Sequence, residues 1–280
     1  MDWFIAALLT GLFFASSRLV SKYVLRKKGN PLPYTALHDL IAGIVLIPFF
    51  FFDFALPSEG KTWVFFGLTV FFLFLADYLV FKSIKLIDIS LYQIIIQVRH
   101  IFVLIGGFIL FTEGITLPKV IAIFLIMFGA SVALYQKSKL HWSKGAIFAF
   151  FQALFASLGF FTAKFALRDF SEASFASLEL MGIGLLGFLF MKLDAKKLFS
   201  EFKLNHWKLV LAAVLFGFFE LFMFISLKLG DISKVIPVTQ VSLVFVVFGG
   251  IVLLKEYERV YQKLAGTVLI IIGILLMYLI

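Results

Sequence analysis

One polar pattern occurs twice in this 280-residue chain, and the two copies lie 143 residues apart. Residues 83–113 read SIKLIDISLYQIIIQVRHIFVLIGGFILFTE, and residues 226–256 read SLKLGDISKVIPVTQVSLVFVVFGGIVLLKE. The matched positions in the first copy are Ser83, Lys85, Asp88, Ser90, Gln97, Gly106, Gly107 and Glu113; those in the second copy are Ser226, Lys228, Asp231, Ser233, Gln240, Gly249, Gly250 and Glu256. Coincident polar residues at one offset are hard to obtain by chance, so we infer that the chain is a duplicated unit.

Composition places both copies in a membrane. Hydrophobic residues make up 62% of the chain and charged residues only 15%, whereas a soluble domain is roughly half apolar and a quarter charged. The remaining polar residues cannot build a water-facing surface, so the expected partner is a lipid bilayer, and nucleic acid is not expected. The absence of cysteine excludes thiolate metal sites and cysteine nucleophiles. We expect no metal and no cofactor.

Ten apolar segments are long enough to cross a membrane as helices. We predict spans at 2–22, 34–52, 62–81, 89–111, 118–136, 145–167, 173–191, 207–227, 232–254 and 263–280. A helix rises about 1.5 Å per residue, so about 20 residues cover the roughly 30 Å hydrocarbon core. Five spans fall in each copy, which predicts an all-α integral membrane protein with domains at residues 1–138 and 139–280. Because five is odd, the second copy enters from the opposite face, and the copies are inverted repeats.

The positive charges predict the orientation in a cell membrane. Of the 25 Lys and Arg residues, 17 follow odd-numbered spans, six follow even-numbered spans, and Arg18 and Arg99 lie inside spans. The positive-inside rule therefore places the odd connections in the cytoplasm and both termini on the outer face. The first apolar run lacks a preceding basic region, so we expect it to be retained as a span.

Several motifs are typical of one transporter family. They are the small-residue segment 11–17 followed by Lys22, and the patterns IKLIDISLYQ and LFTEGITLPKVIAIFLIMFGA with their second copies LKLGDISKVIPVTQ and LLKEYERVYQKLAGTVLIIIGILL. On these residues the chain resembles the drug/metabolite transporter superfamily, in its EamA-type branch of ten helices. The resemblance implies a secondary transporter, often an exporter, of small metabolites or amphiphilic compounds, with a central cavity and no ATP site. The chain departs from the family at His38-Asp39, where Arg is common, and at Arg99-His100, where apolar or small residues are common.

Two carboxylates, Asp77 and Glu220, occupy equivalent places inside apolar spans of the two copies. A charge at such a place costs roughly 2.5–3.5 kcal/mol on insertion scales, so these residues by default face the bundle interior and carry function. A carboxyl group removed from water can hold a proton near neutral pH. Proton coupling is therefore our hypothesis, and a structural ion pair is the alternative. We expect Arg99 to pair with Asp77, which leaves Glu220 as the better candidate for coupling, because its half has Ser242 at the position of Arg99.

Gln93, Gln97 and His100 recur at helical spacing and form a polar stripe on the fourth span. In the ninth span the stripe thins to Gln240 and its neighbours, and Pro237 favours a kink there. We interpret Gln97 and Gln240 as residues that line a cavity and hydrogen-bond the substrate. The alternative is a hydrogen bond between helices.

Three further residues are candidates for the substrate or proton pathway. His38 aligns with Glu179, and histidine titrates near neutral pH, so His38 is either a proton gate or an interfacial residue. Arg18, deep in the first span, is expected to line the cavity and attract an anionic group.

Glu113 and Glu256 are expected to cap the helices that follow them.

These residues predict a secondary active transporter that moves a small organic metabolite by alternating access, with proton coupling or exchange. The resemblance implies that the direction is export. The mixture of arginines and carboxylates suits a zwitterion such as an amino acid. The alternatives are an amphiphilic or quaternary ammonium cation, and a channel or lipid scramblase that needs no alternating closure. The chain has no HExxH, P-loop or GxSxG motif, so we do not predict an enzyme; a hydrolase using Asp77 with Asp39 or Glu220 is a weaker alternative. The protein is expected to act as a monomer or a dimer.

Overall fold

A computed structural model of the protein describes residues 1–25, 31–84, 86–87, 89–135, 143–252 and 258–280. All regular secondary structure in these ranges is helical. Ten segments among them are long and apolar enough to cross a membrane, which confirms the predicted all-α fold with ten spans. The predicted domain boundary between residues 138 and 139 lies outside the described residues.

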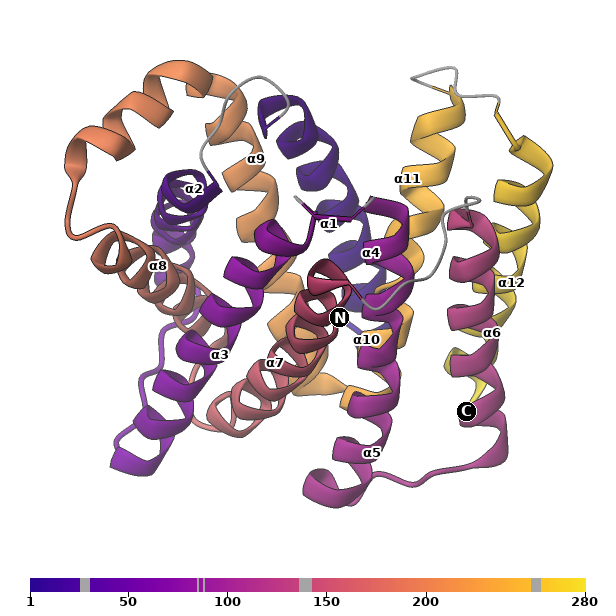
Figure 1. Ribbon diagram of the computed structural model, residues 1–280. Coiled ribbons are helices and arrows are strands. Elements are labelled where there is room, and N and C mark those ends of the chain that lie inside the picture. The colour runs from indigo at the N-terminus through magenta and orange to yellow at the C-terminus, as the bar shows by residue number, and fades with distance from the viewer. Residues whose placement is uncertain (26–30, 85, 88, 136–142, 253–257) are drawn as a thin grey trace.

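The spans follow one another through the two halves in chain order (Figure 1). The first half contains α1 (Trp3–Leu25), α2 (Pro31–Leu46), the 3-10 helix η1 (Ile47–Phe51), α3 (Gly60–Ile84), α4 (Ile89–Ile95), the 3-10 helix η2 (Ile96–Val98), α5 (Arg99–Phe111) and α6 (Leu117–Leu134). The second half contains α7 (Lys144–Ala166), α8 (Glu172–Phe190), α9 (Ala195–Leu229), α10 (Ile232–Val238), α11 (Val241–Val252) and α12 (Val260–Leu279). We call the end with residues 191–194 the odd face, and the opposite end, with residues 52–59, 112–116, 167–171 and 230–231, the even face.

Helices of the two halves pack against each other in matching pairs. α1 packs against α9, and the equivalent pair, α7 with α3, packs in the same way. α2 packs against its own counterpart α8, and α6 packs against α12. At the second of these interfaces a Cβ on Gly266 would lie 2.5 Å from the Gly129 carbonyl oxygen, so glycine is required for this close approach. The pairing is the one expected for inverted repeats.

Spans four and nine are interrupted helices. In span four the α-helix gives way to η2 at Ile96, and in span nine α10 and α11 are separated by Thr239 and Gln240. The sequence analysis predicted a kink only near Pro237. Pro237 has no N–H, so it removes one hydrogen bond from the helix. After it, the Gln240 N–H donates to the Pro237 carbonyl oxygen, three residues back, at 3.1 Å. Because Gln97 lies in η2, both interruptions occur at the two equivalent glutamines.

α9 is longer than the span predicted at 207–227. Its helix begins at Ala195, because the side chain of Asp194 accepts hydrogen bonds from the N–H groups of Lys196 and Lys197 at 3.1 and 3.4 Å. The helix bends at His206, where φ is 11° and ψ is −102°. The segment 195–205 is therefore a separate helical arm at the odd face, and the membrane span begins after the bend.

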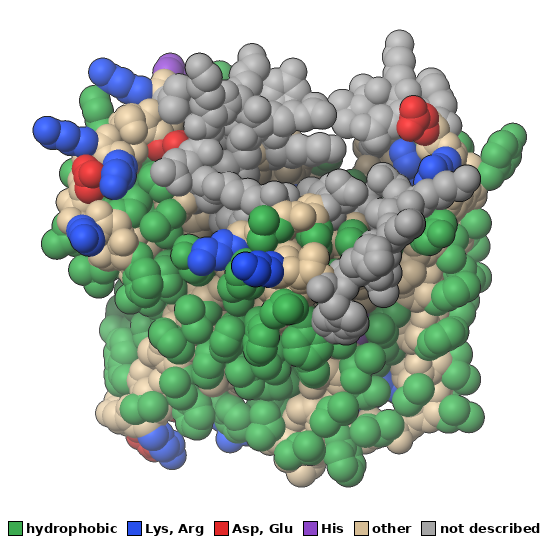
Figure 2. Space-filling view, viewed as in Figure 1, with side chains coloured by type: hydrophobic (Ala, Val, Ile, Leu, Met, Phe, Trp, Pro, Cys, Tyr) green, Lys and Arg blue, Asp and Glu red, His purple; other side chains and the backbone are tan. Residues whose placement is uncertain are grey.

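The surface is apolar around the middle of the bundle and charged at its ends. Figure 2 shows a broad belt of hydrophobic side chains, with Lys and Arg gathered mainly at the end of the molecule drawn at the top. Large side chains such as Ile109 and Phe124 are exposed. A belt of this kind fits the hydrocarbon core of a bilayer.

Candidate functional site

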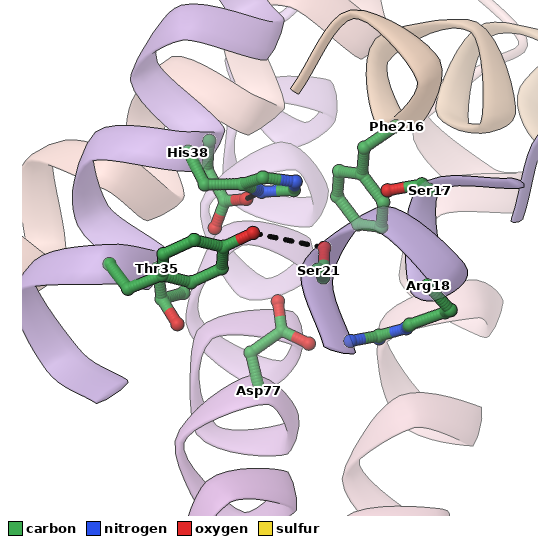
Figure 3. Close-up of a pocket in the computed structure, with 9 residues that line it drawn as sticks. Ser17, Arg18, Ser21, Thr35, His38, Asp77 and Phe216 are labelled. Atoms are coloured by element: carbon green, nitrogen blue, oxygen red, sulfur yellow. Dashed lines mark hydrogen bonds and ion pairs between the residues drawn. The ribbon is translucent and has the colours of Figure 1, made fainter. Parts of the chain in front are cut away.

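A small pocket lies between α1, α2, α3 and α9, close to the odd face. Its lining residues are Ser17, Arg18, Ser21, Tyr34, Thr35, His38, Asp39, Asp77 and Phe216. Figure 3 shows the Asp77 carboxyl group pointing from α3 into this space, with the Arg18 guanidinium extended toward it. The pocket therefore presents a cation and a carboxyl group to the same volume.

Two hydrogen bonds fix the wall of the pocket that α1 forms. Ser17 Oγ donates to the carbonyl oxygen of Ala212 on α9 at 2.9 Å, and the Tyr34 hydroxyl donates to Ser21 Oγ at 2.9 Å. Arg18 lies between the two serines in the sequence, and its guanidinium carbon is 4.9 Å from the Phe14 ring centroid. This cation–π contact helps to orient the guanidinium group, which lines the pocket.

His38 and Asp39 form a polar pair in the α2 wall. The His38 Nδ1 and Asp39 Oδ1 atoms are 2.7 Å apart. The His38 ring packs between Tyr34 and Phe216, with centroid distances of 5.5 and 4.8 Å. His38 Nε2 and Asp39 Oδ2 are buried without a hydrogen-bond partner in the described structure. One nitrogen and one oxygen of the pair can therefore still form a hydrogen bond with a ligand.

Carboxyl groups from four helices gather near the centre of the bundle: Asp39, Asp77, Glu179 and Glu220. Glu179 on α8 is completely buried, and neither of its oxygens has a hydrogen-bond partner among the residues that the structure describes. It interacts electrostatically with the other three carboxyl groups. Glu220, the equivalent of Asp77, is 6% exposed and does not line the pocket. The two equivalent carboxyl groups thus differ in access to the odd face.

Arg99 does not pair with Asp77, so this prediction is wrong. The Arg99 guanidinium carbon lies 6.0 Å from the ring centroid of Phe160 on α7. Its Nε is buried, with no hydrogen-bond partner in the described part of the chain. Arg99 is the first residue of α5, directly after η2, and from this break its side chain reaches α7. The cation that acts electrostatically on Asp77 is Arg18.

The equivalent glutamines Gln97 and Gln240 meet at the interface between the halves. Gln240 Nε2 donates to Gln97 Oε1 at 3.3 Å and lies 2.8 Å from His100 Nε2, which is 3.0 Å from Gln97 Oε1. Gln97 Nε2 also donates to the carbonyl oxygen of Gln93 at 3.3 Å. In this conformation these side chains join the halves and do not line the pocket. Their contact with a substrate stays a prediction.

Four lining residues were not identified from the sequence: Ser21, Tyr34, Thr35 and Phe216. Tyr34 and Thr35 precede His38 and Asp39 by four residues each, and such spacing places polar side chains on one helix face. A search for that pattern would have found the α2 wall. Phe216 is one of 39 phenylalanines, and no sequence signal distinguishes it.

The second half repeats the polar lining only in part: Glu179 and Glu220 stand at the positions of His38 and Asp77. The positions equivalent to Arg18, Ser21, Tyr34 and Thr35, at offsets of 142 residues in the first span and 141 in the second, are Phe160, Ala163, Phe175 and Ala176. All four are buried, with Phe160 the most exposed at 5%. The pocket therefore lies toward the odd face, whereas these four equivalent positions toward the even face carry apolar side chains.

Comparison with known proteins agrees with this architecture. A sequence model of the EamA-like transporter family matches residues 1–135 and 143–279, once in each half. No curated protein matches the chain. A solved chain described as "Crystal structure of protein" is similar in fold, with a TM-score of 0.77 and 15% identity over 99% of this chain and 96% of that chain. The two matches cover nearly the whole sequence, so the chain belongs to the EamA-like transporter family of the drug/metabolite transporter superfamily and is a multi-pass membrane protein.

Proposed function

We propose that the protein is a secondary active transporter of a small zwitterionic metabolite, such as an amino acid. The observation that carries this proposal is the convergence of Arg18 and Asp77 on one pocket. A guanidinium binds a carboxylate through paired hydrogen bonds, and a carboxylate binds an ammonium group. Most residues that line the pocket are polar, and they offer both a cation and a carboxyl group, which suits a small zwitterion.

Proton exchange is the proposed source of energy. Asp77 binds an ammonium group only in its ionised form, so a proton and the substrate compete for the same carboxyl group. Glu179 and Glu220 lie within electrostatic range of Asp77 and are buried away from the pocket. An ionised carboxylate without partners is costly in such surroundings, which supports these groups as proton carriers. Competition at Asp77 would make the transport an antiport.

The proposed direction is export across the cell membrane. Most Lys and Arg residues follow odd-numbered spans, and the positive-inside rule assigns this face to the cytoplasm. The pocket is near the same face, so substrate would load from the cytoplasm. Both termini would then lie on the outer face.

An amphiphilic or quaternary ammonium cation is the second candidate substrate. It is favoured by the excess of carboxyl groups over cations around the pocket, where Arg18 faces Asp39 and Asp77. A channel or scramblase is less well supported, because the buried layer around Phe160 and Phe175 separates the pocket from the even face. We propose no enzymatic activity.

Counterflow in proteoliposomes tests the proposal. Vesicles loaded with an unlabelled compound are given the labelled compound outside, using neutral amino acids, primary amines and quaternary ammonium compounds in turn. We expect saturable counterflow of a zwitterion that falls at least tenfold in Arg18→Gln and in Asp77→Asn. Arg168→Gln is the matched control, since Arg168 is exposed and also lies over a phenylalanine ring, 5.3 Å from the Phe165 centroid.

Each result selects one function. Counterflow of quaternary cations that persists in Arg18→Gln would indicate that the substrate is a cation and not a zwitterion. A proton gradient should drive accumulation in the unmodified protein and not in Asp77→Asn; accumulation that ignores the gradient would remove proton coupling. Flux that does not saturate for any compound would indicate a channel or scramblase.

A further inference from the structure

Glu113, at the end of span four, binds a helix of the opposite half. It was expected to cap the next helix, α6, but Thr116 has that role and accepts the N–H of Lys119 at 3.4 Å. Glu113 Oε1 instead accepts the N–H of Ile232 at 2.8 Å, and its Oε2 accepts the N–H of Ser233 at 3.0 Å and the Ser233 hydroxyl. One carboxylate thus ties the end of span four to the start of span nine.

The chain around Glu113 is shaped to direct it there. Thr112 adopts the left-handed conformation, with φ 56° and ψ 28°, which is uncommon for a residue with a branched side chain. The N–H of Glu113 then returns to the carbonyl oxygen of Gly107 at 3.1 Å. A Cβ on Gly107 would lie only 2.6 Å from Glu113 Oε2, so glycine is needed for the carboxylate to fold back along its own helix.

Two lysines complete the connection between the halves. Lys164 Nζ is 3.6 Å from Glu113 Oε1 and donates to the carbonyl oxygen of Gly230. Lys119 Nζ donates to Ser233 Oγ at 3.0 Å. Glu113, Lys119 and Ser233 are 7%, 2% and 1% exposed. Lys119 Nζ also lies 3.8 Å from Asp231 Oδ2, so the two lysines face two carboxylates. The cluster therefore connects helices of the two halves through ion pairs and hydrogen bonds.

We propose that Glu113, Lys119, Lys164 and Ser233 form a latch that holds the even face closed while the pocket is open at the odd face. The latch would have to release α10 before the even face opens. α10 carries Ser233 of the latch in its first turn and ends at the helix break beside Gln240. A movement of Gln240 would therefore be transmitted to Ser233 along this one short helix. This inference rests on the alternating access of the proposed function, but it requires no knowledge of the substrate.

Thiol labelling tests the latch directly, because the chain contains no cysteine. Single cysteines are placed at two equivalent positions, Ser21→Cys in the odd-face pocket and Ala163→Cys in the closed even half, where Ala163 is 0% exposed. Labelling rates with a charged methanethiosulfonate reagent are measured in nanodiscs, where both faces meet the solution. We expect the cysteine at position 21 to react at least tenfold faster than the cysteine at position 163 when the latch is intact.

Releasing the latch should reverse this preference. Glu113→Gln is expected to raise the labelling rate at position 163 at least tenfold and to lower the rate at position 21. Glu59→Gln is the matched control, since Glu59 is an exposed glutamate of the even face whose carboxylate pairs with Lys61 at 2.6 Å, and it should change neither rate. Rates for Glu113→Gln within twofold of the unmodified background would overturn the proposal. If Glu113→Gln does not yield monodisperse protein, Ser233→Ala, which removes one hydroxyl, is judged by the same twofold limit. Because the readout uses no substrate, the latch can fail while the proposed function stands, and the proposed substrate can be wrong while the latch stands.

Discussion

Replacing Glu179 with methionine is expected to stabilise the protein while abolishing coupled transport. Glu179 is completely buried, and both of its oxygens lack a hydrogen-bond partner among the described residues. A buried polar group left unsatisfied costs about 1–3 kcal/mol even when it is neutral. Methionine has a similar length and adapts to irregular apolar space, so Glu179→Met should recover most of this energy. For a chain of this size, each kcal/mol raises Tm by roughly 2–4 °C.

Two comparison variants separate the effect of removing a buried polar group from the effect of removing an ionisable one. Glu179→Gln keeps a buried polar group and removes the ionisable one, so it should leave Tm nearly unchanged and still abolish the response to a pH gradient. Glu172→Met is the control on the same helix, because Glu172 forms an ion pair with Lys228 at 3.4 Å in the first turn of α8. Removing that pair should give no gain in Tm.

The measurements are Tm in detergent, followed by size-exclusion chromatography after heating, and counterflow with and without a pH gradient. A fall in Tm for Glu179→Met would refute the reasoning, since it would mean that the carboxyl group has a structural partner. An unchanged gradient response in both Glu179 variants would remove Glu179 from the proton pathway. Either result would leave the pocket around Arg18 untouched.

Two other substitutions test the packing and the centre of the bundle. Gly266→Leu should lower stability by about 3 kcal/mol, because the new Cβ would lie 2.5 Å from the Gly129 carbonyl oxygen; Gly67→Leu, where a Cβ meets nothing within 4 Å, is the control in the same thermal assay. Gln240→Leu should lower the free energy of unfolding by about 1–3 kcal/mol, because it leaves Gln97 and His100 buried with fewer hydrogen-bond partners. It should also reduce counterflow. A loss of stability without a change in counterflow would limit these residues to a structural role.

The ten spans could be predicted from the sequence because a bilayer imposes length and apolarity on each segment separately. The inverted relation followed from counting five spans in each copy. Contacts between helices could not be predicted in the same way, because they depend on local breaks. Arg99 shows this most clearly: its pairing with Asp77 assumed a continuous helix through span four, and η2 interrupts that helix immediately before Arg99.

The candidate site was predicted in part. Arg18, His38 and Asp77 were identified because a charged or titratable side chain inside an apolar span is conspicuous, and the structure brings these three into one pocket. Tyr34 and Phe216 were missed because aromatic residues are common throughout this chain. The cross-half contact of Glu113 was missed for another reason: a cap is usually local, and the residues that direct Glu113 to Ser233 lie in another span.

Comparison of equivalent positions separates the parts of the site that serve the cycle from those that serve the substrate. Two pairs keep their chemistry in both halves: Asp77 with Glu220, and Gln97 with Gln240. Arg18 does not, since its equivalent is the buried Phe160. Inversion of the repeats exchanges the roles of the two halves, so any step performed alternately from each face needs its residues twice. A substrate is carried once in each passage and can be held by one half alone. We therefore expect the carboxyl pair and the glutamine pair to take part in the alternating steps, with Asp77 also binding the substrate, whereas Arg18 is expected to act in recognition of the substrate alone.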